Sequence, residues 1–155
     1  QLGILQGNET VYLLKEQPPN AVTLVTDVGV RLPAHLTASG RAMLAHLPAA
    51  HVRAQLPSAT SFSTRTGRGP ASLTALRAVL AKERRRGWAS EDGEVTEGLA
   101  SVAAAVFDHG GRPVAAVALT FDARTDDRTR ARLGPAAVAA ADAVSARISG
   151  RRPVG

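Results

Sequence analysis

Two apolar segments, residues 101–107 and 114–121, constrain the fold more strongly than any other feature of this sequence. Both are rich in alanine and valine, and a short stretch containing Gly110-Gly111 joins them. A glycine pair between two strand-like segments is typical of a tight hairpin turn, because glycine adopts the backbone angles that such a turn requires. The sequence therefore predicts an antiparallel β-hairpin in the second half of the chain.

The hairpin also predicts which side chains share one face of the sheet. With Gly110-Gly111 as a two-residue turn, alternation along the strands gives one face small residues: Ser101, Ala103, Ala105, Ala116, Ala118 and Thr120. A core face usually carries Val, Ile and Leu, so this composition leaves room for another molecule. A helix packed closely against the sheet would require the same small residues, and the two interpretations stay open at this point.

The remaining elements follow from turn, cap and periodicity signals. Further strands are expected over residues 2–5, 11–14 and 21–26, with a hairpin turn at Gly7-Asn8 and a loop marked by Gly29 and Pro33. Helices are expected over residues 38–47, 49–56, 73–86 and 127–149, with a loop over residues 57–70. Antiparallel strands interleaved with a few helices make a single α+β domain over residues 1–155.

Cap and stripe residues define the ends and buried faces of these helices. Thr37 and Ser72 are candidate N-caps, and Gly87 is a natural helix stop. Gly150 is expected to end the last helix, and residues 151–153 to form a frayed tail. The last helix should bury one apolar stripe, made of Leu133, Ala137, Ala141, Val144 and Ile148.

Composition excludes several classes of protein. The chain has no cysteine, which excludes disulfide scaffolds, thiol nucleophiles and iron–sulfur sites. We expect a cytoplasmic protein without membrane contact, because no apolar run is long enough to span a bilayer and no signal pattern opens the chain. The net charge of +6 comes from scattered arginines, and the densest basic run, residues 82–86, closes a helix. Direct binding of nucleic acid by this domain is therefore not expected.

Enzymatic and metal-binding motifs are also missing from the sequence. No serine lies in a nucleophile elbow, and no dinucleotide fingerprint is present. The four histidines lack the spacing of a zinc-binding helix: His35, His46, His51 and His109. We expect no catalytic residue, no metal and no cofactor.

Two other segments are candidate binding elements. The predicted helix start Thr37-Ala38-Ser39-Gly40 has small side chains and free backbone amides, which a carboxylate or phosphate could approach. An acidic patch with Glu91 at its start precedes the Ser101 strand. Each has an ordinary alternative, since every helix has an N-terminus and an acidic patch can be a solvated loop.

At this point the order of motifs resembles that of the IclR-type transcriptional regulators. The segment 31–45 (RLPAHLTASGRAMLA) is similar to the family pattern RLPxHxTAxGKAxLA, and 85–89 (RRGWA) is similar to its xxxGYA element. Residues 98–108 (GLASVAAAVFD) resemble GxxSIAAPVFD, and the strand over 113–120 (PVAAVALT) follows in the same order. The resemblance covers nearly the whole chain.

The resemblance implies a C-terminal effector-binding domain with a GAF-like, profilin-like fold, in which helices flank a twisted antiparallel sheet. Family members carry an N-terminal winged helix-turn-helix that contacts operator DNA, and nothing like it precedes Gln1. We therefore expect the sensor part of a regulator, contacting DNA only through that domain and forming a homodimer or a dimer of dimers. Its expected ligand is a small organic acid.

Family resemblance also implies site residues, which are carried over by motif. The amide donors are Ala38 and Ser39, the acidic position is Glu91, the strand positions are Ser101, Ala118 and Thr120, and the apolar wall is Leu32 and Leu99. Ala118 lacks a hydroxyl that many relatives offer, and Glu91 replaces Asp and is expected to accept a ligand hydroxyl. Arg41 replaces Lys and is expected at the helix surface. The hairpin register independently places Ser101, Ala118 and Thr120 on one face.

Two other functions remain open for the same residues. One is a GAF-like module that binds a cyclic nucleotide or senses through a bound metal, which would need a larger cavity and a phosphate clamp. The other is an interaction module whose pocket is filled by its own side chains.

Overall fold

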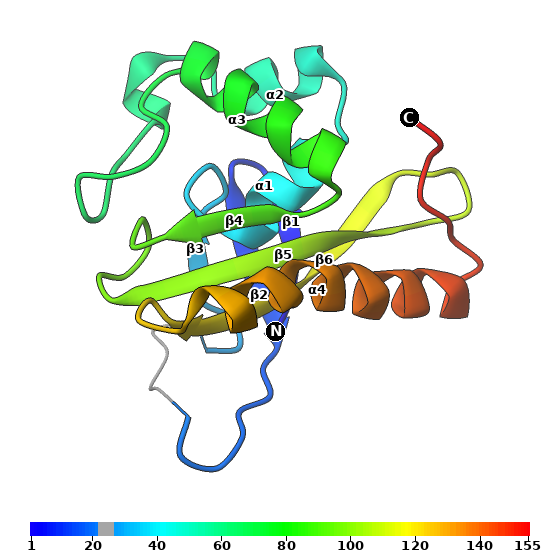
Figure 1. Ribbon diagram of the computed structural model, residues 1–155. Helices are drawn as coiled ribbons and strands as arrows, with labels where there is room; N and C mark the ends of the chain where they lie inside the picture. Colours follow the sequence, from blue (N-terminus) through cyan, green and yellow to red (C-terminus); the bar gives the residue numbers. More distant parts are fainter. Residues whose placement is uncertain (22–26) are drawn as a thin grey trace.

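The computed structural model describes residues 1–21 and 27–155 and contains a six-stranded sheet in the order β3-β2-β1-β6-β5-β4 (Figure 1). Its strands are β1 (Leu2–Gln6), β2 (Glu9–Leu14), β3 (Arg31–Pro33), β4 (Ala89–Asp92), β5 (Leu99–Phe107) and β6 (Pro113–Asp122). All neighbouring strands pair antiparallel. The helices are α1 (Ala38–Leu44), α2 (Ala49–Gln55), α3 (Leu73–Arg86) and α4 (Asp127–Arg147), with a short 3-10 turn at Ala59–Ser61.

The β5–β6 hairpin has the register that the sequence predicts. Its pairs include Ser101 with Thr120, Ala103 with Ala118 and Ala105 with Ala116. The prediction of a two-residue turn is wrong, however. The strands end at Phe107 and begin again at Pro113, and the register shifts by one residue beside Phe107. Asp108 closes the longer loop by accepting a hydrogen bond from the Gly111 amide at 3.0 Å. The irregularity is confined to the tip, so the pairing below it is unaffected.

The sheet is covered on both faces, with α4 on one side and α1 on the other (Figure 1). Ala137 and Ala141 of α4 are fully buried against the valines of β5, Val102 and Val106. On the opposite face, α1 packs its small residues and Met43 onto the alanines of the hairpin. Small side chains on both sides allow close approach of helix and sheet, which confirms the predicted α+β layering.

The start of α1 is fixed by a chain of short contacts. Thr37 is the N-cap, as predicted, and its hydroxyl accepts a hydrogen bond from the Gly40 amide at 2.9 Å. The same hydroxyl lies 2.9 Å from that of Thr10 on β2, which ties the helix start to the sheet. A Cβ on Gly40 would lie 2.3 Å from the Ala34 carbonyl oxygen, so only glycine allows this approach.

Several predicted boundaries require correction. Helix α1 ends at Leu44, three residues early, and α4 ends at Arg147, before Gly150. The short strands β3 and β4 lie in segments that were expected to be loops. Each strand has only three or four residues, which is too few for the alternation of buried and exposed side chains to be recognised in the sequence. The strand expected over residues 21–26 falls, apart from Ala21, outside the described residues.

The C-terminal region also differs from its prediction. Ile148, expected in the buried stripe of α4, is 48% exposed, because the helix has already ended. The expected frayed tail is docked beside the tip of the hairpin (Figure 1). Arg152 donates a hydrogen bond to the Gly87 carbonyl at 3.2 Å and forms an ion pair with Asp142 at 3.1 Å. The guanidinium of Arg152 also lies over the ring of Phe107, 5.5 Å from its centroid.

Within the described ranges, none of the helices combines the length and the apolarity that crossing a bilayer demands.

Candidate functional site

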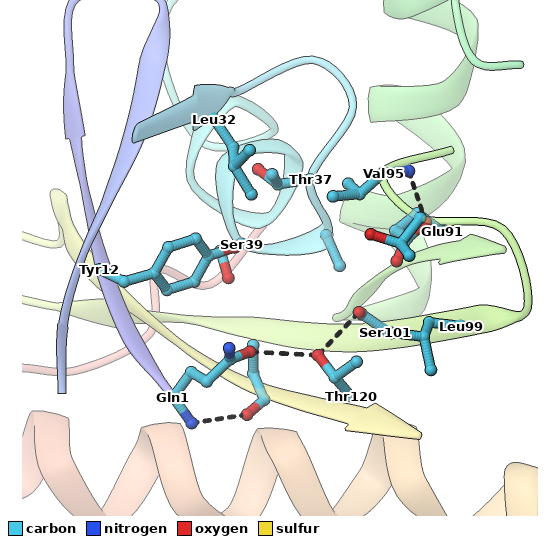
Figure 2. A pocket seen from close by; sticks show the side chains of 13 residues that line it. Gln1, Tyr12, Leu32, Thr37, Ser39, Glu91, Val95, Leu99, Ser101 and Thr120 are labelled. Atoms are coloured by element: carbon cyan, nitrogen blue, oxygen red, sulfur yellow. Dashed lines mark hydrogen bonds between the residues drawn. The ribbon is translucent and has the colours of Figure 1, made fainter. Parts of the chain in front are cut away.

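A cavity lies between the start of α1, the small-residue face of β5 and β6, and the loop over residues 93–98 (Figure 2). It is lined by all eight residues that the sequence analysis selected: Leu32, Ala38, Ser39, Glu91, Leu99, Ser101, Ala118 and Thr120. The structure thus brings together residues of five elements: β3, α1, β4, β5 and β6. Whether these residues bind a ligand stays a prediction.

Five further residues line the cavity: Gln1, Tyr12, Thr37, Val95 and Thr96. Thr37 could have been selected, because the predicted N-cap adjoins the predicted amide donors. Tyr12 was harder to recognise: the sequence shows only that it is the one tyrosine in the chain and that it lies on a predicted strand. Val95 and Thr96 carry no local signal, because they reach the cavity only through the path of the loop before β5.

The cavity is narrow in this structure. The empty space between its walls is about 400 Å³ when its open mouth is included, but the lining side chains leave room inside for about one water molecule. A ligand larger than water therefore requires a wall of the cavity to move.

Polar groups without partners face this space from the α1 side. Ser39 is 1% exposed, and the described residues offer its hydroxyl no hydrogen bond of normal geometry. The same part of the structure provides no acceptor for the backbone amides of Ala38 and Ser39, because Thr37 caps Gly40 instead. Buried polar groups are rarely left unpaired, so these are the groups that a polar ligand would satisfy.

On the sheet side, the two hydroxyls of the hairpin are bonded to each other. Ser101 Oγ and Thr120 Oγ1 are 2.9 Å apart, and Thr120 donates to Gln1 Oε1 at 3.1 Å (Figure 2). Either hydroxyl can be the donor between Ser101 and Thr120, and the Ser101 hydroxyl also lies close enough to Glu91 to lower the pKa of that carboxyl. The pair therefore brings both donor and acceptor capacity to this wall of the cavity.

Glu91 brings a carboxylate to the third wall from the edge strand β4. It is 5% exposed, and its Oε2 accepts hydrogen bonds from the amides of Glu94 at 3.0 Å and Val95 at 3.4 Å. Burial raises the pKa of Glu91 above its usual value, although the nearby Ser101 hydroxyl and these amides partly oppose the rise. The acidic patch is therefore not simply a solvated loop, since this carboxylate points inward.

Tyr12 closes the wall opposite the loop, with its ring beside Ser39 (Figure 2). The side chain is 4% exposed, and burial raises the pKa of its phenol. The neighbouring hydroxyls of Ser39 and Thr37 oppose that rise, which places three hydroxyl groups close together at this end of the cavity.

Arg41 is not on the helix surface, and this expectation was wrong. Its side chain is 2% exposed and forms an ion pair with Glu83 of α3 at 3.2 Å. The guanidinium also donates to the Ser90 carbonyl of β4 and to the carboxylate of Glu94. The long-range partners explain the error, because a local helix pattern does not show which side chains another helix and a loop bring against it.

Two of the four histidines, His35 and His46, make structural contacts. The Nε2 of His35 lies 2.8 Å from the Ser63 carbonyl oxygen, and the His46 ring packs edge-on against Phe107. Among the residues described by the structure, no three His, Cys, Asp or Glu side chains are grouped as metal ligands.

Comparisons with known proteins relate this cavity to a family of regulators. Residues 1–146 match the family model described as the C-terminal domain of the bacterial transcriptional regulator IclR. The chain is 38% identical over 127 residues to the HTH-type transcriptional regulator XynR of Escherichia coli (strain K12), covering 81% of this chain and 50% of the relative. It is 34% identical over 119 residues to the glycerol operon regulatory protein of Streptomyces coelicolor, covering 77% of this chain and 46% of the relative. The chain thus spans about half the length of these relatives.

Solved structures agree with these sequence matches. The repressor BlcR of Agobacterium tumefaciens superposes with a TM-score of 0.83 at 30% identity, covering 96% of this chain and 58% of that one. The IclR protein of Thermotoga maritima gives a TM-score of 0.86 at 26% identity, covering 97% of this chain and 60% of that one. The fold is α+β and GAF-like, as predicted. The chain belongs to the IclR family of bacterial transcriptional regulators and matches their C-terminal domain.

Proposed function

We propose that this chain is an effector-binding domain and that its cavity binds a small organic acid. The observation that supports this most strongly is the meeting of unpaired donors, two hydroxyls and a buried carboxylate in one hollow between α1 and the hairpin. The amides of Ala38 and Ser39 and the Ser39 hydroxyl would bind the carboxylate of the acid. No group in this arrangement pairs a nucleophile with a base, so the proposed role is binding without catalysis or a cofactor.

Each side of the cavity would contact a different part of the ligand. Ser101 and Thr120 would form hydrogen bonds with the polar atoms at the far end of the acid, since a hydroxyl can both donate and accept. Glu91 would accept a ligand hydroxyl. Leu32 and Leu99 would contact the apolar body of the ligand.

Control of transcription would follow from a difference in affinity between two states. An effector shifts DNA binding only by the difference between its affinities for two arrangements of the protein. In this proposal, operator DNA is bound by an N-terminal winged helix-turn-helix outside the chain described here. The domains assemble as a homodimer or a dimer of dimers, and the regulator works in the cytoplasm.

A thermal-shift screen tests the proposal. Aromatic, keto and dicarboxylic acids are compared with ATP, cAMP and cGMP. An acid present at 100 times its dissociation constant should stabilise the chain by about 2.7 kcal/mol. The double variant Ser101→Ala/Thr120→Val should lose this shift, whereas Thr74→Val, which changes an exposed threonine on α3, should keep it. Stabilisation by nucleotides alone, or by no compound, would contradict the proposal.

A further inference from the structure

The loop over residues 93–98 forms a wall of the cavity that belongs to neither a helix nor a strand. The other walls belong to β5 and β6, which are paired along their length, and to α1, which is packed on the sheet. The loop joins β4 to β5 and brings Val95 and Thr96 to the cavity. Because the cavity has room for little more than a water molecule, a ligand enters only if a wall moves, and this loop is the wall best able to do so.

Side chains hold the loop in place at several points. The Glu91 carboxylate accepts hydrogen bonds from the amides of Glu94 and Val95, and Arg65 donates one to the Val95 carbonyl at 3.0 Å. Thr66 donates to the Gly93 carbonyl at 2.6 Å. The ion pair between Glu94 and Arg41 connects the loop to α1.

Arg41 is held far more firmly than the loop that it contacts. It lies one turn after Ala38, and its guanidinium bonds to Glu83 of α3 and to the Ser90 carbonyl next to Glu91. Its side chain is 2% exposed, whereas that of Glu94 is 19% exposed. A buried, multiply bonded guanidinium is a rigid anchor, so movement of the loop requires release of Glu94 rather than movement of Arg41.

We propose that the Arg41–Glu94 ion pair holds the 93–98 loop closed over the cavity and so controls access to it. Both are positioning residues: neither lines the cavity, and each acts through the loop and through Glu91. The identity of what enters rests on the proposed function, but the gating does not, because opening can be measured without a ligand.

The absence of cysteine from the chain allows a direct measurement of opening. The substitution Ala118→Cys places a single thiol in the cavity wall, at a position that is 3% exposed. Its rate of modification by iodoacetamide, a small neutral reagent, then reports how often the cavity opens. Ala141→Cys, at a fully buried position of α4, reports unfolding of the domain in the same way.

Removal of the ion pair should raise the modification rate of the cavity thiol but not that of the thiol on α4. In the Ala118→Cys background we expect Glu94→Ala to accelerate modification about tenfold, which corresponds to ~1.4 kcal/mol in the opening equilibrium. The modification rate of Glu94→Gln should lie between the rates with Glu94 and with Ala at this position. Glu97→Ala is the matched control, because it removes an exposed carboxylate from the same loop and should leave the rate unchanged.

Two outcomes would overturn the gate. Glu94→Ala could leave the modification rate of the cavity thiol unchanged, or it could accelerate both reporters equally, which would mean general destabilisation. If the cavity thiol alone reacts faster while no acid binds in the thermal-shift screen, the gate stands and the proposed function fails. If an acid binds while the reaction of the cavity thiol is unaffected by Glu94→Ala, the proposed function stands and the gate fails.

Discussion

The two faces of the β5–β6 hairpin differ although they come from the same two strands. The face toward α4 carries Val102, Ala104 and Val106, and the alanines of the helix fill the space between them. Its buried Ser145 hydroxyl is fully satisfied, because it donates to the Ala141 carbonyl at 2.9 Å and accepts from the Phe107 amide at 3.0 Å, whereas the buried Nε of Arg130 on the same helix has no partner among the described residues. This side resembles an ordinary packed core.

The face toward α1 is packed at one end and hollow at the other. Ala103 and Ala116 meet the helix, whereas Ser101 and Thr120 border the cavity with Ser39 unpaired opposite them. A buried ion network centred on Arg41 adjoins this face, whereas the ion pair between α4 and the sheet, Arg130 with Asp92, is partly exposed. Small side chains alone therefore do not create a site; the layer placed over them decides whether space remains.

The largest effect is expected from loss of the buried cation beside the cavity. Arg41→Ala leaves Glu83, which is 4% exposed, without its counter-charge, and we expect a loss of about 3–5 kcal/mol in the free energy of unfolding. Arg124→Ala breaks the exposed pair with Asp122 and should cause no measurable change. Urea unfolding measures both, and equal losses would mean that the network beside α1 is not buried as described.

The same substitution on the two faces should have different costs. Ala141→Val adds two methyl groups to a full interface and should destabilise the domain by about 1–3 kcal/mol. Ala118→Val adds them beside the hollow, where we expect less than ~1 kcal/mol and a loss of effector binding. Thermal unfolding of the two variants compares the costs, and a larger cost at Ala118 would mean that the cavity is as full as the α4 interface.

The α1 side should also determine part of the pH dependence of stability. Burial lowers the pKa of His46 to about 4, and the charges of Arg84 and Arg152 act in the same direction. The unfolded chain binds this proton below about pH 6.5. Stability should therefore fall as the pH falls from 6.5 to 4, by about 1–2 kcal/mol because solvent screens the partly exposed ring. His46→Gln should flatten this part of a urea-unfolding pH profile; an unchanged slope would exclude His46 as its source.

A small effect on stability is also expected from the hydroxyl pair that we assign to the ligand. Ser101→Ala with Thr120→Val removes both partners of the bond between the two hydroxyls and the donor to Gln1 Oε1, so the free energy of unfolding should change by about 1 kcal/mol. Effector affinity, measured by calorimetry, should fall clearly in the same variant. A large loss of stability with unchanged affinity would make the pair a structural feature of the sheet.

Features set by short-range rules could be predicted from the sequence. Strand alternation and pairing placed Ser101 opposite Thr120, and the cap residues Thr37, Ser72 and Gly87 marked helix ends correctly. The turn was mispredicted, but the extra residues are absorbed at the tip of the hairpin and leave the register intact.

Features set by long-range contacts could not be predicted in this way. Arg41 is buried because Glu83 and Glu94 arrive from distant segments, and β4 forms because β5 supplies its partner strand. Val95 and Thr96 reach the cavity through the path of a loop that has no periodic pattern. The narrowness of the cavity likewise depends on side-chain packing, which strand register alone does not determine.

The most direct test of the proposed site is an amide NMR titration of the chain with the acid that gives the largest thermal shift. We expect the strongest changes at the amides of Ala38 and Ser39, with further changes at Glu94 and Val95 as the loop moves. Amides of α4, such as that of Ala141, should change little. Strongest changes on the α4 face, with Ala38 and Ser39 unaffected, would contradict an effector site between α1 and the hairpin.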